Sequence, residues 1–154
     1  IFLIKLVFLV LLISLIDIYF NIMNIKSSKE LVDEANEVIK VMSPEQVKSA
    51  YIKNEITLID VRDIRELWKE GTIKNAIHIP RGMLEFWLDP QSSYYQEKKI
   101  GKIKNIVLFC ALGFRSALAT KALKEMGFNN VANAKGGFDS LKNVGLPIVA
   151  KEEK

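Results

Sequence analysis

The stretch 105-NIVLFCALGFRS-116 joins a short apolar run to a loop that contains a cysteine, a glycine and an arginine. The apolar run, Asn105–Phe109, is what a strand buried on both faces of a parallel sheet requires. Residues 115–126 then place apolar side chains at helical spacing, and Gly127 ends that pattern. A strand that passes directly into a helix is the building unit of a parallel sheet, so this stretch predicts an α/β domain.

The rest of the sequence continues the alternation of strands and helices. Apolar spacing and capping residues predict helices over residues 28–41, 44–53, 62–70 and 138–145, and a single helical turn over 83–88. Short apolar runs predict further strands over residues 56–60, 76–79 and 131–134, and a loop is expected over 89–101. We therefore expect one α/β domain with a parallel sheet covered by helices on both faces.

Cys110 is the only cysteine of the chain, and it follows the predicted strand directly. Ligands of parallel α/β sheets bind at the carboxyl ends of the strands. The short loop after Cys110 can turn its N–H groups inward around an anion, and the helix terminus and Arg115 add positive potential. This potential lowers the pKa of a thiol and favours the nucleophilic thiolate. We expect Cys110 to be catalytic and the substrate- or anion-binding loop to consist of Ala111, Leu112, Gly113, Phe114, Arg115 and Ser116.

Other kinds of cysteine chemistry lack partners in this sequence. A thiol protease needs a histidine base, and the only histidine, His78, is expected to be a structural hydrogen-bonding group. A dithiol redox centre needs a second cysteine. A cysteine phosphatase has one more residue between its cysteine and arginine than the four between Cys110 and Arg115, and the smaller ring favours a single sulfur atom. An inert, buried cysteine at a strand end is the remaining alternative.

Composition excludes several other classes of protein. The chain has 22 Lys and Arg against 18 Asp and Glu, without a dense basic run, so no nucleic-acid partner is expected. One cysteine cannot form an internal disulfide, which excludes a disulfide scaffold and favours a cytoplasmic location. One cysteine and one histidine cannot build a zinc site of the usual kinds, so neither a metal nor another cofactor is expected.

Residues 1–22 are almost entirely apolar, with Lys5 and Asp17 as interruptions. The run is long enough for a membrane anchor, or for a signal that would direct the chain to the periplasm. A third interpretation is an upstream extension translated by mistake, because Met23 opens a conventional polar start. A membrane is thus an expected partner only if residues 1–22 are genuine. Beyond them we expect N-terminal helices over residues 23–54, the main domain over 55–150 and a charged tail over 151–154.

Four motifs in the right order resemble the rhodanese domain family. They are Asp60-Val61-Arg62-Asp63 with Glu66 and Gly71, Ala76-Ile77-His78-Ile79-Pro80, the loop from Cys110 to Ser116, and Lys135-Gly136-Gly137-Phe138 with Gly145-Leu146-Pro147. The resemblance covers about residues 29–150, and the insert over 82–90 looks like that of a bacterial single-domain branch. It implies a rhodanese-like fold, in which a five-stranded parallel sheet is flanked by helices on both faces.

The resemblance also implies a sulfurtransferase of the thiosulfate sulfurtransferase kind. In this reaction the Cys110 thiolate takes the outer sulfur of thiosulfate or another small donor anion, and the loop amides hold the resulting persulfide. The sulfur then passes to a thiol or to cyanide. The reaction requires inward-pointing amides and a sulfur that solvent can reach. Asp60, Arg62 and Arg81 are candidate supporting residues, although structural ion pairs with Asp60, Glu85 or another carboxylate would suit Arg81 and Arg115 equally well.

Several positions depart from the family pattern. Thr72 and Asn75 stand where His and Gly are usual, in an expected turn away from the loop, and Lys135 and Leu141 replace an acidic residue and a tryptophan. The loop contains one arginine and no further cation, whereas thiosulfate carries two negative charges. A polysulfide or a protein persulfide is therefore an alternative donor. A sulfur carrier without turnover and a small arsenate reductase or phosphatase are alternative functions.

Overall fold

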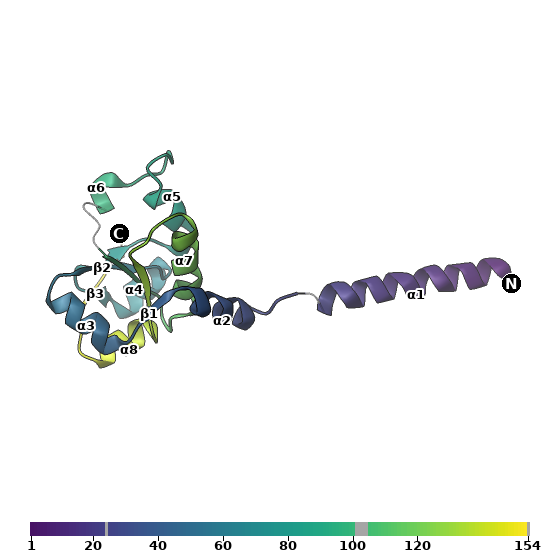
Figure 1. The fold of residues 1–154 in the computed structure, drawn as a ribbon, viewed down its shortest axis with the longest axis horizontal. Coiled ribbons are helices and arrows are strands. Elements are labelled where there is room, and N and C mark those ends of the chain that lie inside the picture. Colours follow the sequence, from purple (N-terminus) through teal and green to yellow (C-terminus); the bar gives the residue numbers. More distant parts are fainter. Residues whose placement is uncertain (24, 101–104, 154) are drawn as a thin grey trace. The chain divides into compact units, whose positions relative to one another are not determined.

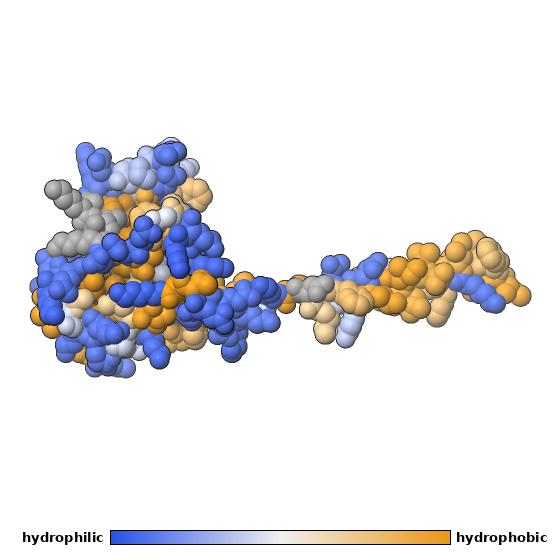
Figure 2. Space-filling model, viewed as in Figure 1, coloured by the Kyte–Doolittle hydropathy of each residue, from blue (hydrophilic) through white to orange (hydrophobic). Residues whose placement is uncertain are grey.

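The computed structural model describes residues 1–23, 25–100 and 105–153, and the chain divides into two compact units, residues 1–31 and 32–154. The first unit contains helix α1 (Phe2–Met23), drawn in purple in Figure 1. Its side chains are exposed throughout. Figure 2 shows apolar residues along most of this helix. The helix is long and apolar enough to cross a membrane, a test that signal sequences near an N-terminus also pass.

The second unit is built on a five-stranded sheet in the order β1-β6-β5-β2-β4, and every neighbouring pair is parallel. Its strands are β1 (Lys40–Met42), β2 (Ile56–Asp60), β4 (Ile77–His78), β5 (Asn105–Phe109) and β6 (Val131–Ala134). The predicted five-stranded parallel sheet is thus confirmed. Four of the strands lie where the sequence predicts them, and β5, the strand that leads to Cys110, lies at the centre.

Helices cover both faces of this sheet, as predicted (Figure 1). They are α2 (Ser28–Val38), α3 (Pro44–Ile52), α4 (Ile64–Glu70), η1 (Arg81–Met83), α5 (Leu84–Leu88), α6 (Glu97–Ile100), α7 (Phe114–Glu125) and α8 (Gly137–Asn143). Side chains alternate along β5, so Ile106 and Leu108 pack with α5 and α7, whereas Val107 and Phe109 pack with α3 and α8. These two apolar layers hold β5 in place from both sides.

The fifth strand, β1, corrects one prediction. The helix predicted over residues 28–41 ends at Val38, and Lys40–Met42 instead pairs with β6 through the register Lys40–Ala132 and Met42–Ala134. No glycine or proline separates the helix from the strand, so the helical spacing appeared to continue. Backbone pairing with a distant strand determined the outcome, and periodicity along the chain does not report such pairing.

Local capping signals place two helix starts. Ser43 caps α3, and the Ser43 hydroxyl and the Gln46 side chain exchange hydrogen bonds with each other's backbone N–H groups, as the sequence predicts. Asp63 and Glu66 form the same arrangement before α4, so this helix begins at Ile64 rather than at residue 62. A short helix, α6, lies within the predicted loop 89–101, of which residue 101 is outside the described residues.

A two-stranded antiparallel sheet was not predicted. It pairs β3 (Thr72–Ile73) with β7 (Ile148–Val149). Each strand has two residues, too few for an alternating pattern to be recognised. The expectation that Thr72 lies in a turn is therefore wrong, because Thr72 is buried in β3 and its hydroxyl donates to the Asp60 carboxylate at 2.7 Å. Asn75 does lie in the turn that follows, with a positive φ of 66°.

Candidate active site

Cys110 follows the last residue of β5, at the carboxyl edge of the sheet, and α7 begins four residues later at Phe114. The predicted loop therefore runs from the end of a central strand into the first turn of α7, which contains Phe114, Arg115 and Ser116. The loop has a sharp turn at Gly113, whose φ is 95°. Such a conformation is open to glycine and costly for residues with a side chain. The strand fixes the position of the cysteine, and the turn folds the chain back over its sulfur.

The N-terminal turn of α8 orients the loop. The carbonyl of Cys110 accepts a hydrogen bond from the N–H of Phe138 at 2.7 Å, and the carbonyl of Ala111 accepts one from the N–H of Asp139 at 3.3 Å. The C=O and N–H of one trans peptide point in opposite directions. With these carbonyls held outward, the amides of the loop are free to face the sulfur.

Hydrogen-bond donors converge on the sulfur of Cys110. The N–H of Gly113 donates to Sγ at 3.2 Å, and the hydroxyl of Ser116 does so at 3.4 Å. Burial raises the pKa of the Cys110 thiol, but hydrogen bonds from the Ser116 hydroxyl and from the N–H groups of Ser116, Gly113 and Leu112 outweigh it. The pKa therefore lies below the ordinary 9.0, in the direction expected from the sequence.

The sequence analysis required a sulfur that solvent can reach, and the structure does not meet this expectation. Cys110 retains 1% of its surface, whereas Leu112 and Phe114 at the rim of the loop are 52% and 60% exposed. The sulfur therefore lies inside the ring of amides, in a segment that carries two exposed apolar side chains. A second sulfur bonded to Sγ would extend about 2 Å further into that ring. This burial restricts the size of any molecule that reacts with Cys110.

Arg115 does not offer an unpaired charge to an anion. Its guanidinium donates to both carboxylate oxygens of Glu66, at 2.7 and 2.8 Å. The hydrogen bonds of this pair raise the pKa of Arg115, and the charge of the Cys110 thiolate adds to this rise. The same hydrogen bonds lower the pKa of Glu66. The sequence names Glu66 as a motif residue, and the structure shows it to be the partner of the loop arginine.

The three candidate supporting residues lie in ion pairs. Arg62 and Asp60 are fully buried, with donor–acceptor distances of 3.0 and 2.8 Å, and the Arg62 guanidinium also donates to the Gly71 carbonyl and covers the ring of Phe138. This network supports Phe138, whose N–H binds the Cys110 carbonyl. Arg81 pairs with Glu85 at 2.8 Å. The structure therefore shows the structural ion pair that was the alternative to a supporting role for Arg81.

His78 has a contact that fits the structural role expected for it. Its Nε2 lies 2.8 Å from the carbonyl oxygen of Arg62. A second polar contact that the sequence analysis did not single out involves Asn133 of β6, whose Nδ2 donates to the carbonyl of Gly113 at 3.1 Å. An asparagine within a strand that is otherwise apolar is the signal that could have identified it.

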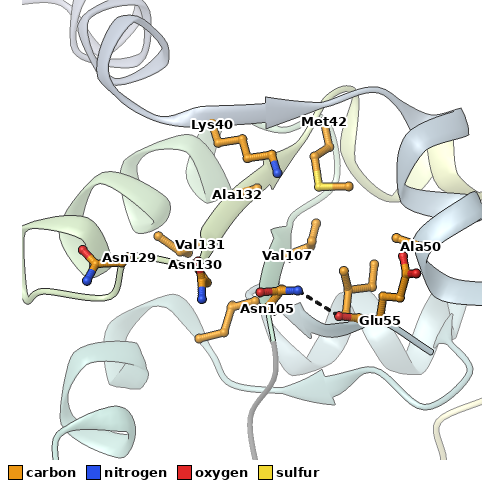
Figure 3. Close-up of a pocket in the computed structure, with 12 residues that line it drawn as sticks. Lys40, Met42, Ala50, Glu55, Asn105, Val107, Asn129, Asn130, Val131 and Ala132 are labelled. Atoms are coloured by element: carbon orange, nitrogen blue, oxygen red, sulfur yellow. Dashed lines mark hydrogen bonds between the residues drawn. The ribbon is translucent and has the colours of Figure 1, made fainter. Parts of the chain in front are cut away.

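Two cavities lie near the edges of the sheet. One of about 280 Å³ opens at the amino ends of β5 and β6, where Asn105 donates to the Glu55 carbonyl (Figure 3). It lies at the edge of the sheet opposite to Cys110. Another of about 420 Å³ lies beside the loop and is lined by Asn36, Val41, Leu112, Gly113, Phe114, Asn133, Lys135 and Gly136. Within the described ranges, no three His, Cys, Asp or Glu side chains gather in a way that could hold a metal ion.

Comparisons with known proteins agree with this geometry. The family model described as "Rhodanese-like domain" matches residues 43–143. A curated protein of Allochromatium vinosum named "Sulfurtransferase" is 30% identical over 98 residues, which are 64% of this chain and 82% of that protein.

Solved structures show the same fold. A protein of Rhodopseudomonas palustris, described as a possible tyrosine phosphatase of unknown function, aligns with a TM-score of 0.75 and 36% identity over 80% of this chain and 95% of its own. The polysulfide-sulfur transferase homodimer of Wolinella succinogenes aligns with a TM-score of 0.61 and 37% identity over 78% and 85% of the two chains.

Proposed function

The chain belongs to the rhodanese-like domain family, and on that premise we propose that it is a sulfurtransferase that carries a sulfane sulfur as a persulfide on Cys110. One observation carries the proposal. Inward-pointing donors from Gly113 and Ser116 lie at 3.2 and 3.4 Å from the only sulfur nucleophile of the chain. Relatives named sulfurtransferase and polysulfide-sulfur transferase support the same class of reaction.

The first step loads the enzyme. The Cys110 thiolate attacks the terminal sulfur of the donor, a new S–S bond forms, and the donor leaves with the electron pair of the bond that breaks. With thiosulfate the leaving group is sulfite, and with a polysulfide it is a chain shorter by one sulfur. The persulfide keeps one negative charge, which the loop amides stabilise as fixed dipoles that need no reorganisation.

The second step returns the enzyme to its starting state. A thiolate or cyanide attacks the outer sulfur of the persulfide, takes it as a new persulfide or as thiocyanate, and leaves the Cys110 thiolate with the electron pair. No oxidant or reductant enters either step. The same donors that lower the pKa of the Cys110 thiol make it a good leaving group here.

The surroundings of the sulfur favour a slender donor. Arg115 is paired with Glu66, and Leu112 and Phe114 present apolar side chains at the rim. The bulky sulfonate end of thiosulfate fits such a rim poorly, whereas the unbranched chain of a polysulfide can reach a sulfur inside a ring. We propose a polysulfide or another persulfide-type donor ahead of thiosulfate.

Intact-mass spectrometry tests the proposal. The full chain, treated in turn with polysulfide and with thiosulfate, is expected to gain the mass of one sulfur atom, with faster loading from polysulfide. Cyanide or a thiol should remove that sulfur, and Cys110→Ser should gain none. Circular dichroism of the variant checks that it is folded, since Ser is close to Cys in size.

Three results would contradict the proposal. A folded Cys110→Ser protein with full transfer activity would remove Cys110 from the reaction. One sulfur per chain without repeated turnover would indicate a carrier. Hydrolysis of an aryl phosphate in place of sulfur transfer would favour the phosphatase suggested by the Rhodopseudomonas palustris relative.

A further inference from the structure

Asn133 is a buried polar residue next to the active loop. It lies on β6 beside Leu108 of β5 and is 3% exposed. Its neighbours along the strand, Ala132 and Ala134, pack into the apolar layer on the other face of the sheet. The Asn133 side chain spans the distance from the sheet to the loop, where its amide Nδ2 donates to the carbonyl of Gly113 at 3.1 Å.

The side-chain oxygen of this amide lacks a hydrogen-bond partner. Within the described residues, Oδ1 of Asn133 is buried and no protein group donates to it. A buried acceptor without a donor destabilises a fold relative to an apolar side chain of similar size. Leucine would fill the same space between β6 and α7 without that cost. Packing and stability therefore do not explain why asparagine occupies this position.

The contact with Gly113 offers an explanation. Gly113 is the turning point of the loop, and its own N–H donates to Cys110 Sγ at 3.2 Å. Its carbonyl accepts two hydrogen bonds, one at 3.2 Å from the N–H of Ala117 in the first turn of α7 and one from Asn133. With the bond from Ala117 alone, the turn at Gly113 would be attached only to α7 and could move with that helix. The bond from Asn133 attaches the same turn to the central sheet.

We propose that Asn133 is a positioning residue, whose amide holds Gly113 so that the donors of the loop stay aimed at the sulfur of Cys110. Asn133 acts through Gly113 and does not itself touch the sulfur. The role deepens the proposed sulfur transfer and rests on it for its biological meaning. The titration of the thiol, however, can be measured whether or not sulfur is transferred.

The test replaces the amide by a side chain of similar size, Asn133→Leu, in the full chain. The thiolate of the single cysteine is titrated by its ultraviolet absorbance, and the midpoint of thermal unfolding is measured on the same samples. We expect the titration midpoint to rise by about one pH unit, and the unfolding midpoint to stay the same or rise. Arg115, which interacts electrostatically with the thiolate, and its partner Glu66 are unchanged in this variant.

Asn105→Leu is the matched control. Asn105 lies at the other end of the sheet, where its Nδ2 donates to the Glu55 carbonyl at 3.2 Å (Figure 3). Its replacement removes the same type of hydrogen bond, here at an exposed position far from the loop, and should leave the titration of Cys110 unchanged.

The two measurements distinguish a positioning role from a structural one. A lower unfolding midpoint with an unchanged titration would show that Asn133 serves stability only, and would overturn the proposal. If Asn133→Leu does not fold, Asn133→Ala loses the donor without adding bulk or charge, and an unchanged titration there would equally overturn the proposal. A raised titration midpoint in a protein whose wild type transfers no sulfur would support Asn133 and count against the proposed function alone.

Discussion

At the residue scale, the ion pair between Arg115 and Glu66 determines how much positive charge the loop presents. The sequence places Arg115 in the loop, and its charge alone suggests an anion site. In the fold, both carboxylate oxygens of Glu66 accept hydrogen bonds from the guanidinium of Arg115. The pair lies at the surface, with side chains 44% and 30% exposed, so water screens it in part. The rate of sulfur transfer from an anionic donor should therefore depend on Glu66.

Glu66→Gln tests this dependence. Glutamine can still accept the hydrogen bond from the Asp63 N–H that starts α4, but it leaves the guanidinium of Arg115 without a counter-charge. We expect kcat/KM for thiosulfate, a dianion, to rise about tenfold, the effect of about 1.4 kcal/mol of new attraction. Glu70→Gln makes the same change of charge away from Arg115 and should leave this kcat/KM unchanged. Equal effects of both variants would show that only net charge matters.

The same pair gives a pH dependence of stability. The hydrogen bond from Arg115 lowers the pKa of Glu66 below its ordinary 4.5, so the pair adds stability that is present above that value. This contribution is lost as the pH falls through the lowered pKa. In urea titrations at a series of pH values, Glu66→Gln should therefore lose less stability on acidification below pH 4.5 than the wild type does.

Single residues differ in how well the sequence reveals them. Cys110 and the loop from Ala111 to Ser116 could be predicted as a candidate site because a lone nucleophile follows a strand and precedes a helix. The partnership of Glu66 with Arg115 joins residues 49 positions apart, and that of Asn133 with Gly113 joins residues 20 apart. No pattern along the chain reports either contact.

At the scale of elements, the loop and the start of α8 fit together through glycine. A Cβ atom on Gly137 would lie 2.3 Å from the Cys110 carbonyl oxygen and 2.6 Å from that of Ala111. Gly137 also has a φ of 59°, which disfavours other residues. The carbonyls of Cys110 and Ala111 must point away from the sulfur for the loop amides to face it. The absence of a side chain at Gly137 lets these two carbonyls approach the start of α8.

Gly137→Ala is expected to disturb both the fold and the thiol. The new methyl group must push the loop away from α8, at a cost of about 1–3 kcal/mol in addition to the backbone strain. The thiol pKa should rise as the donors leave the sulfur. Gly127→Ala is the matched control, because its φ of 99° imposes similar strain while no atom lies within 4 Å of the new Cβ. Equal losses of stability in both variants, with an unchanged thiolate titration, would show that the contact does not hold the loop.

The elements that could be predicted are those with a local signal. The apolar run of β5, the helical spacing of α7 and the capping box of α3 each lie within a few consecutive residues. β1, β3 and β7 have two or three residues each and exist because distant backbone groups pair with them. Their formation depends on the assembled sheet, which a window on the sequence does not contain.

At the scale of the whole molecule, the chain combines an α/β domain with a separate apolar helix. We propose that α1 anchors the sulfurtransferase to a membrane, because 22 residues at 1.5 Å each match the thickness of a bilayer core. None of its side chains is buried by protein, and its mean hydropathy is 2.5 over an 18-residue window. The alternatives from the sequence, a signal and an upstream extension, make different predictions.

Fractionation of cells that express the full chain tests the anchor. The protein is expected to sediment with membranes and to resist extraction by high salt, while a chain that starts at Met23 should stay in the supernatant. Mass spectrometry of the native protein provides the check. An N-terminus at Met23 would support the extension, and processing that removes the helix would support the signal.

The depth of Cys110 also has a consequence for how copies of the protein meet. A disulfide requires two sulfurs to come within about 2 Å of each other. Cys110 is only 1% exposed, so its sulfur cannot approach its counterpart in a second folded copy. Exposure to air should therefore produce no covalent dimers. A cell could keep this reactive thiol at high protein concentration without cross-linking it to itself.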